Sequence, residues 1–332
     1  MNKAALTPKD NSLLLLLCLS YAIGIYLFFY NPWFESLFLR HELQDLSHYP
    51  YLEFAQKFFK RNYYENPGQW WIESLLFPFL IKLYGASRSI IAFKIFASIL
   101  TISFLPIITI GYLKISNNIS QSFILLALLT VFYGGLYDYQ VAFPDSLLVI
   151  FLGLAALQKN IRPLFAFIFL AGLTHFSITF FCSVSLVILF YSAPIPLKAP
   201  RYKYALATIL ALILSWIVIQ LWLSYMHTPG GYGRLAWASN SGLDYFIERY
   251  SKNPLNFWLT PKYLLLLSFA AINLYFLYMK KWIFVFAAFV SLAIAYFCQF
   301  FTIDGYRVFI TVFCGPYIFL LVSFIQTLFR KN

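Results

Sequence analysis

The sequence predicts an all-α fold: a polytopic transmembrane helical bundle of about ten spans that forms a single domain over residues 1–332. Hydrophobic residues make up 61% of the chain and charged residues 11%, against roughly 25% charged in an average soluble domain. Apolar runs that match the roughly 30 Å of bilayer hydrocarbon follow one another almost end to end. Helices suit such runs because they satisfy their own backbone polar groups in lipid. Basic residues gather beside the ends of these runs, which is typical of membrane proteins.

The net charge of +12 does not indicate a nucleic-acid partner, because the basic residues lie near predicted helix ends and form no soluble basic patch. The four cysteines fall inside apolar runs, which disfavours a disulfide framework or a zinc site. The first apolar run, 12–30, follows Lys3 and Lys9 and so resembles a signal peptide. Its length and its bulky aromatic flank instead favour a retained helix.

Two later apolar runs are anomalous. The run 71–84 is short for a span, and the run 163–193 is too long for one untilted span and has His175 near its middle. Both fit if 71–84 lies on the outer surface and 163–193 is a hairpin of two short helices that turns near His175. Four basic clusters then all face the cytoplasm, as the positive-inside rule predicts: Lys159/Arg162, Lys198/Arg201/Lys203, Lys280/Lys281 and Arg330/Lys331. The remaining predicted spans are 12–30, 89–113, 119–136, 140–157, 204–226, 260–279, 282–302 and 307–327.

This topology predicts a multi-pass membrane protein with both termini in the cytoplasm. The two large outer loops are 31–88 and 227–259. Eleven of the twelve acidic residues then fall on the outer side, and only Asp10 is cytoplasmic. The positive-inside rule concerns Lys and Arg and does not require this. Either only the outer loops are long enough to hold acids, or the outer side carries the chemistry.

The first outer loop is predicted to hold two interfacial juxtamembrane helices. In Pro50–Arg61 the apolar residues recur at helical spacing, with polar residues on the other face, which is the pattern of a helix lying in the membrane interface. The paired Trp70 and Trp71 suit the headgroup level. We expect a second interfacial helix after them, running to Tyr84 and ending at Gly85.

This loop resembles that of the GT-C glycosyltransferases, which use polyprenyl-phosphate-linked sugars. The resemblance rests on Asp45-Leu46-Ser47-His48-Tyr49 with Ala55 soon after, then Asn66-Pro67, then a Leu-rich stretch that ends at Gly85. It covers about fifty residues. Many GT-C proteins carry a second acid where Leu46 stands, and Asp45 lies later than usual after the first helix. The resemblance therefore leaves open whether Glu35 or Glu42 takes the acidic role.

The middle of the chain, Asp138 to Phe181, resembles bacterial exopolysaccharide polymerases. It shares a polar turn, a basic loop and an Ala-x-x-x-His-x-Ser segment from Ala171 to Ser177. It lacks the Arg-Gln pair common there and has Pro144-Asp145 instead. Both resemblances imply glycan chemistry at the outer face of a bacterial inner membrane.

The GT-C resemblance implies an inverting glycosyltransferase. Its donor would be a polyprenyl-phosphate or polyprenyl-pyrophosphate sugar, and its acceptor a glycan, a lipid or a protein. Such a transfer needs a base for the acceptor hydroxyl, commonly a carboxylate. Asp45 is the first candidate for this base, and Glu42 is expected to orient the acceptor or to help bind a metal. His48, within the same motif, is a candidate for substrate binding.

Cations stabilise the negative charge of the departing phosphate, and the Arg guanidinium can donate two parallel hydrogen bonds to it. Arg307 begins the last span at its outer end, where either phosphate binding or snorkelling to the interface explains it. Arg234 lies in a glycine loop that could close over substrate. His175 either lines a cavity at the helix break or is a packed, hydrogen-bonded residue.

Asp138 and Asp145 flank an outer turn and are further candidates for substrate binding. Asp145 lies within an apolar run, so a buried carboxylate there needs a partner such as Arg307 or Arg88. No group of His and acidic residues is close enough in the sequence to indicate a metal site. The cofactor is therefore unknown, although a divalent cation suits the chemistry.

Three alternatives to a single-transfer enzyme stay open. They are a transporter or flippase of lipid-linked glycans, a polysaccharide polymerase, and a scaffold subunit of a polysaccharide complex. Broken helices also occur in transporters, but the sequence shows no inverted repeat and its acids are one-sided. The expected partners are a lipid-linked sugar donor, its acceptor and membrane lipids.

Overall fold

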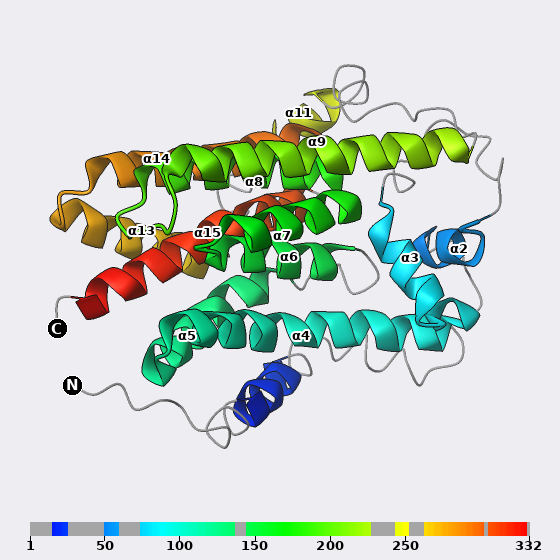
Figure 1. Cartoon of the computed structure of the whole chain (residues 1–332), viewed down its shortest axis with the longest axis horizontal. Coiled ribbons are helices and arrows are strands. Elements are labelled where there is room, and N and C mark those ends of the chain that lie inside the picture. Colours follow the sequence, from blue (N-terminus) through cyan, green and yellow to red (C-terminus); the bar gives the residue numbers. More distant parts are fainter. Residues whose placement is uncertain are drawn as a thin grey trace.

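The computed structural model describes residues 15–25, 50–59, 74–136, 144–226, 243–251, 262–301 and 305–330. In these ranges all regular structure is helical, so the predicted all-α class is confirmed (Figure 1). The first described helix is Leu15–Ile25. The others are α2 (Pro50–Gln56), α3 (Leu76–Leu83), η4 (Ala86–Arg88), α4 (Ile90–Ser116), α5 (Ile119–Leu136), α6 (Asp145–Leu157), α7 (Ile161–Thr174), α8 (Phe176–Ser192), α9 (Arg201–Tyr225), α11 (Leu243–Ser251), α13 (Lys262–Tyr278), α14 (Trp282–Phe297), η6 (Cys298–Phe301) and α15 (Gly305–Arg330).

Three of these helices, α4, α9 and α15, are long and apolar enough to cross a membrane. Seven further apolar helices in the described ranges are shorter. A bilayer crossing takes about 20 residues, so the predicted count of about ten spans is not confirmed. The shorter helices keep the predicted order and positions, and several of them are buried among the long ones.

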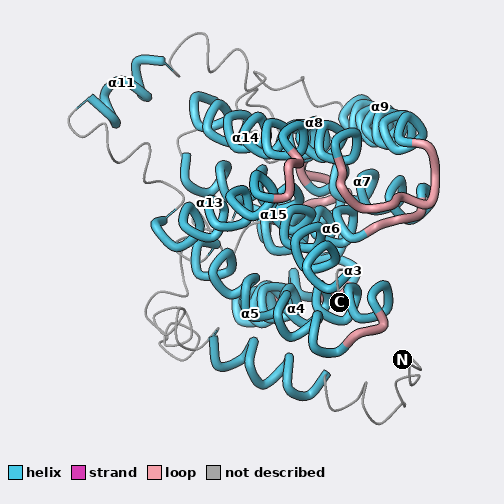
Figure 2. Tube along the Cα trace, turned by 90° about the vertical axis from the view of Figure 1, so that its left-hand side faces the viewer, coloured by secondary structure: helices cyan, strands magenta, loops and turns pink. Residues whose placement is uncertain are grey.

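The centre of the bundle is α15. Buried residues make up 94% of its apolar window, against 44% for α4 and 39% for α9. A helix that is apolar on every side is stable only when other helices surround it or when lipid does. Here α5, α6, α8, α13 and α14 pack around it, as the end-on view shows (Figure 2).

One side of α9 instead presents apolar side chains to the outside of the protein. A soluble monomer rarely exposes a contiguous apolar patch of more than a few hundred Å². The exposed stripe on α9 follows the helix along most of its length, which suits contact with lipid tails. It consists of Leu206, Ile209, Leu210, Ile213, Leu214, Trp216, Ile217 and Leu221.

The predicted hairpin at His175 is confirmed. Helices α7 and α8 meet at this residue, whose backbone is extended, with φ −160° and ψ 93°. The last carbonyl groups of a helix need partners. Two of them are satisfied by the segment before α3: the Ser74 hydroxyl donates to the Thr174 carbonyl at 2.6 Å, and the Leu75 N–H donates to the Leu173 carbonyl at 2.9 Å.

Helices α2 and α3 lie together at one end of the bundle, here called the α3 end (Figure 1). α3 has eight residues, about 12 Å of helix, so it is too short to span. Most of the apolar face predicted for Pro50–Arg61 is buried against other parts of the protein: Tyr51, Leu52, Phe54 and Ala55 of α2, and Phe58 just beyond it. The helix itself ends at Gln56, earlier than predicted, and Phe59 is 62% exposed rather than part of the buried face.

The opposite end of the bundle, here called the basic end, is formed by the turns 117–118, 158–160, 193–200 and 279–281 and by the last turn of α15 (Figure 1). Among the described residues this end carries basic side chains and no acidic one. They are Lys114, Lys159, Arg162, Lys198, Arg201, Lys203, Lys280, Lys281 and Arg330. The four described acids lie elsewhere: Glu53 on α2, Asp145 at the start of α6, and Asp244 and Glu248 on α11.

Candidate functional site

Asp145 and Arg307 form a buried ion pair at the α3 end. Arg307 Nη1 lies 3.5 Å from Asp145 Oδ2, and the two side chains are 6% and 2% exposed. α6 and α15 run in the same direction side by side, so their first turns meet although they are far apart in the sequence. Of the two partners considered for Asp145, the structure selects Arg307; Arg88 has an exposed side chain in η4.

The distance between the two side chains shows what kind of contact they make. A charge-assisted N–H···O⁻ hydrogen bond is about 2.7–2.9 Å long, so a separation of 3.5 Å marks an ion pair rather than a bidentate fork. Asp145 lies in the first turn of α6, where the helix dipole favours a negative charge. Because the Arg307 side chain is buried, snorkelling to the interface does not describe it.

Sequence reasoning missed a second buried cation, Lys94. It lies in the second turn of α4 and is 1% exposed. Ser98 and Thr101 follow it on the same face of α4, and both are buried. The Thr101 hydroxyl hydrogen-bonds the Ser146 hydroxyl at 2.7 Å, so this face meets the start of α6. A lysine inside an apolar run is the signal that identifies it, since such residues are rare and costly in membranes.

We call the buried polar residues of these first turns, with the Thr101 hydroxyl and its partner, the polar cluster of the α3 end: Lys94, Ser98, Thr101, Asp145, Ser146 and Arg307. The Asp145–Arg307 pair links α6 to α15 and the Thr101–Ser146 bond links α6 to α4, while Lys94 and Ser98 precede Thr101 on the same face of α4. In the described ranges, Lys94, Asp145 and Arg307 are the only Lys, Arg, Asp or Glu residues that are buried. Two cations and a carboxylate held in an apolar surrounding interact more strongly with a charged ligand than they would in water.

α2 and α3 cover this end of the bundle. Tyr51 and Leu52 of α2 and Phe77 of α3 pack in one cluster with Leu147, which lies two residues after Asp145 in α6. Phe58, just beyond α2, stacks on Trp222 of α9 with ring centroids 4.6 Å apart. Such a pair contributes about 0.5–1.5 kcal/mol beyond its area. The first loop is therefore anchored beside the polar cluster.

His175 lies at the same end, on the break between α7 and α8, and is 9% exposed. Its N–H donates to the Ala171 carbonyl at 2.8 Å, and its carbonyl accepts from the Thr179 hydroxyl at 2.9 Å. Both hydrogen bonds use main-chain atoms of His175, so the role of its imidazole stays a prediction.

The other candidate residues lie outside the described ranges. They are Asp45, Glu42, His48, Asp138 and Arg234, and their roles stay predictions. Asp45 precedes the start of α2 by five residues in the sequence.

Within the described ranges, no three His, Cys, Asp or Glu residues lie together as a metal site would need. The four cysteines, Cys18, Cys182, Cys298 and Cys314, are buried thiols. Burial in apolar surroundings is typical of structural rather than reactive cysteines.

The comparisons with known proteins returned nothing: no family model, no curated protein and no solved structure matches this chain. The function is therefore argued from the polar cluster and the elements around it.

Proposed function

We propose that the protein is an inverting membrane glycosyltransferase that takes its sugar from a polyprenyl-phosphate or polyprenyl-pyrophosphate donor. The observation that carries the proposal is the buried Asp145–Arg307 ion pair at the end that α2 and α3 cover, and a further buried cation, Lys94, lies in the second turn of α4. The acceptor is a glycan, a lipid or a protein. The reaction takes place at the extracytoplasmic face of an inner membrane.

The cations suit the leaving group of this reaction. As the bond between the sugar and the phosphate breaks, negative charge grows on the phosphate oxygens, and preorganised cations stabilise that charge. Arg307 offers a planar fork that matches phosphate oxygens, and Lys94 offers a compact positive charge. Asp145 holds the Arg307 guanidinium in place by the ion pair.

The chemistry at the other side of the sugar needs a base. Asp45 removes the proton of the acceptor hydroxyl, whose oxygen attacks the anomeric carbon as the bond to the phosphate oxygen breaks. The electron pair of that bond leaves with the lipid phosphate, and the proton stays on the Asp45 carboxyl. A well-placed carboxylate contributes about 10²–10⁴-fold to such a step. Glu42 orients the acceptor, and His48 contacts the substrate.

Asp45→Asn tests the base. Asn is nearly isosteric with Asp but cannot accept the proton, so transfer should be abolished while expression and donor binding are kept. Glu42→Gln is the matched control and should have the milder effect. A dead Glu42→Gln enzyme with an active Asp45→Asn enzyme would move the base to Glu42. Full activity in both variants would end the glycosyltransferase proposal.

Arg307→Lys tests recognition of the phosphate. The lysine keeps the charge beside Asp145 but loses the planar fork, so donor affinity should fall by about tenfold, the size of one charge-assisted hydrogen bond. Arg88→Lys is the same change at an exposed residue of the α3 end and should leave donor affinity unchanged. Equal donor affinity in the wild type and in Arg307→Lys would leave Arg307 as a structural residue.

Transport of a lipid-linked glycan is the second candidate, favoured by the helix break at His175. The carbonyls of that break are satisfied by Ser74 and Leu75 rather than turned to a pathway, which favours the enzyme. Proteoliposomes with a labelled lipid-linked sugar separate the two. A glycosyltransferase forms a new covalent product, whereas a transporter moves the lipid across the bilayer unchanged.

A further inference from the structure

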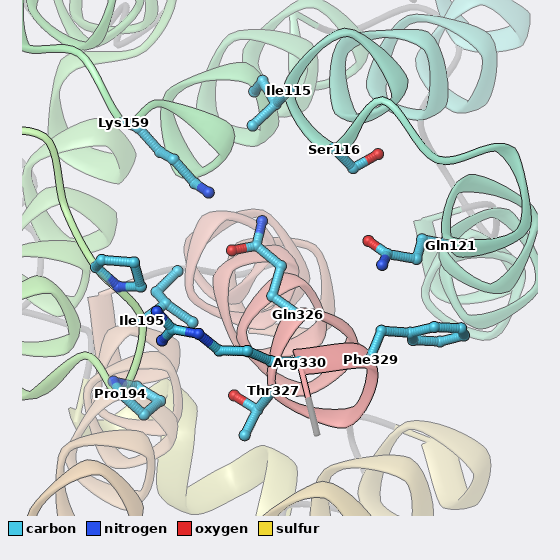
Figure 3. Close-up of a pocket in the computed structure, with 11 residues that line it drawn as sticks. Ile115, Ser116, Gln121, Lys159, Pro194, Ile195, Gln326, Thr327, Phe329 and Arg330 are labelled. Atoms are coloured by element: carbon cyan, nitrogen blue, oxygen red, sulfur yellow. The ribbon is translucent and has the colours of Figure 1, made fainter. Parts of the chain in front are cut away.

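The basic end of the bundle contains a pocket of about 330 Å³. It lies between the turn that joins α4 to α5, the turns on either side of the α7–α8 hairpin, and the last turns of α15 (Figure 3). Arg307–Arg330 covers 24 residues, and a straight helix of that length spans about 36 Å. The pocket is therefore at the far end of α15 from the Asp145–Arg307 pair, and its role is independent of the proposed glycosyl transfer.

Two cations line this pocket. Lys159 comes from the turn between α6 and α7 and extends toward Gln326 of α15, while Arg330 extends from the same helix toward Ile195 (Figure 3). Lys159 is half-buried, whereas the other described basic residues of the basic end are exposed. It is therefore the basic residue of this end that the fold turns inward.

Lys159 is held in a place that is unfavourable for its charge. Burial, with the nearby cations Lys198 and Arg330, lowers the pKa of the Lys159 ammonium below its ordinary value. Among the described residues the basic end carries no acid; Asp10, the acid that the sequence assigns to this side, lies outside the described ranges. An anion in the pocket would offset both effects, since an opposite charge close by favours the charged lysine.

The rest of the lining supplies neutral hydrogen-bonding groups. Gln121 and Gln326 bring amide groups, and Ser116 and Thr327 bring hydroxyls. Gln121 is held in place, because the Tyr112 hydroxyl donates to its Oε1 at 3.0 Å and its N–H donates to Asn118 Oδ1 at 3.0 Å. With that oxygen engaged, the amide NH₂ of Gln121 is the group left to donate to a ligand.

The Lys159 main chain is also fixed. Its carbonyl accepts a hydrogen bond from the Tyr204 hydroxyl of α9. Arg201 of the same helix donates to the Ala193 carbonyl at 3.1 Å, which anchors the stretch that carries Pro194 and Ile195. The walls of the pocket are therefore tied to one another rather than formed by separate surface side chains.

We propose that this pocket binds a phosphate group that carries net negative charge, with Lys159 and Arg330 as its cations and the Gln121 and Gln326 amides as further donors. The phosphate belongs either to the headgroup of an anionic phospholipid or to a free phosphate ion. Pockets of Lys and Arg between helices on the cytoplasmic side of membrane proteins suit anionic headgroups, and this pocket opens where the helices end.

Binding is tested on the purified full chain in neutral detergent at constant ionic strength. Three probes are titrated separately: dioctanoyl phosphatidylglycerol, dioctanoyl phosphatidylcholine and potassium phosphate. Binding is measured as the rise in Tm with ligand concentration. Phosphatidylglycerol should stabilise the wild type, and phosphatidylcholine, whose choline offsets the phosphate charge, should not.

Lys159→Gln with Arg330→Gln should weaken the binding of phosphatidylglycerol by about tenfold or more, because two charge-assisted contacts are lost. Lys280→Gln with Lys281→Gln removes the same charge from the basic end outside the pocket and should not change that affinity. If the first double variant does not fold, Lys159→Gln is compared with Lys159→Arg, which should keep the affinity.

The titration with potassium phosphate shows whether the bound phosphate group is a free ion or part of a lipid headgroup. If potassium phosphate stabilises the wild type but not the pocket variant, free phosphate suffices; if only the lipid does so, the ligand is a headgroup. Two results overturn the proposal. In one, neither phosphatidylglycerol nor phosphate stabilises the wild type. In the other, the Lys280/Lys281 variant loses as much affinity as the pocket variant, which would indicate attraction to the basic surface in general.

Discussion

Asp145 and Arg307 are two buried charges, and each lowers the free energy of burying the other. Bringing a charge out of water is unfavourable unless a partner offsets it, and each residue is the partner that the structure provides for the other at 3.5 Å. The pair thus has two roles that are separable by experiment: it stabilises the fold, and it positions Arg307 for the proposed phosphate contact.

A double-mutant cycle measures the first role. Asp145→Asn and Arg307→Gln should each lower the free energy of unfolding by about 3–5 kcal/mol, because each leaves the other charge buried without this partner. The double variant should lose less than the sum of the two single changes. The free energies are measured by unfolding in mixed micelles. Strictly additive losses would show that the two side chains do not interact energetically.

Lys159 gives a prediction about pH. Its pKa is lowered in the folded protein from the ordinary 10.5, so between the lowered pKa and 10.5 the unfolded chain holds more protons than the folded one. The free energy of unfolding of the ligand-free protein should then rise with pH across this window. The effect is small, because Lys159 is only half-buried and solvent screens it. Lys159→Gln should reduce the rise, whereas Lys280→Gln should leave it as in the wild type.

At the scale of the elements, α7 and α9 approach each other closely at a glycine, which gives this contact a clear cause in the sequence. Gly172 lies in α7 against Ser215 of α9, and a Cβ added at Gly172 would lie 2.7 Å from the Ser215 Cβ. The missing side chain lets the two helices approach, as small residues do in membrane helix pairs. This contact also positions the end of α7 that carries Thr174, next to His175.

Gly172→Ala should therefore lower the free energy of unfolding by about 1–3 kcal/mol, the usual cost of overfilling a packed contact. Gly24→Ala is the matched control, because an added Cβ there meets nothing within 4 Å. It should be neutral or stabilising by about 0.5–1 kcal/mol, since Ala suits a helix better than Gly. Adding Ser215→Gly to Gly172→Ala should restore part of the loss. A harmless Gly172→Ala would mean that the helices separate without cost.

The two ends of the molecule's long axis differ in charge. The α3 end holds the buried polar cluster, including Asp145, and the basic end holds a surface of Lys and Arg with no described acid. In a membrane, we expect the basic end to face the cytoplasm, as the positive-inside rule predicts. The proposed transfer site then faces outward and the proposed phosphate pocket faces inward, at opposite ends of α15.

Cysteine labelling tests this orientation. All four native cysteines are buried, so the background with an impermeant maleimide should be low. Tyr84→Cys, at a residue that is 71% exposed at the α3 end, should react in intact cells. Asn160→Cys, at an exposed residue of the basic end, should react only after the cells are opened. Labelling of position 160 in intact cells would invert the topology and move the proposed transfer site inside.

Much of the fold follows from local features of the sequence. Apolar runs placed the helices to within a few residues, and α5 begins and ends at the predicted positions, 119 and 136. The hairpin at His175 followed from the excess length of 163–193 and from the charges on either side of it. These features can be predicted because apolar runs and helix ends are determined by residues close together in the sequence.

The sequence by itself thus determined the all-helical class, the order of the helices, the hairpin and the separation of acidic from basic ends. Only the tertiary structure decided that Arg307 rather than Arg88 pairs with Asp145, that Lys94 is buried, and that Lys159 turns into a pocket. Among the described residues three helices are long and apolar enough to cross a membrane, so the predicted count of about ten spans is not confirmed. The reason is physical. Which faces of two helices meet depends on how side chains pack between segments distant in the chain, and composition and local periodicity do not specify that packing.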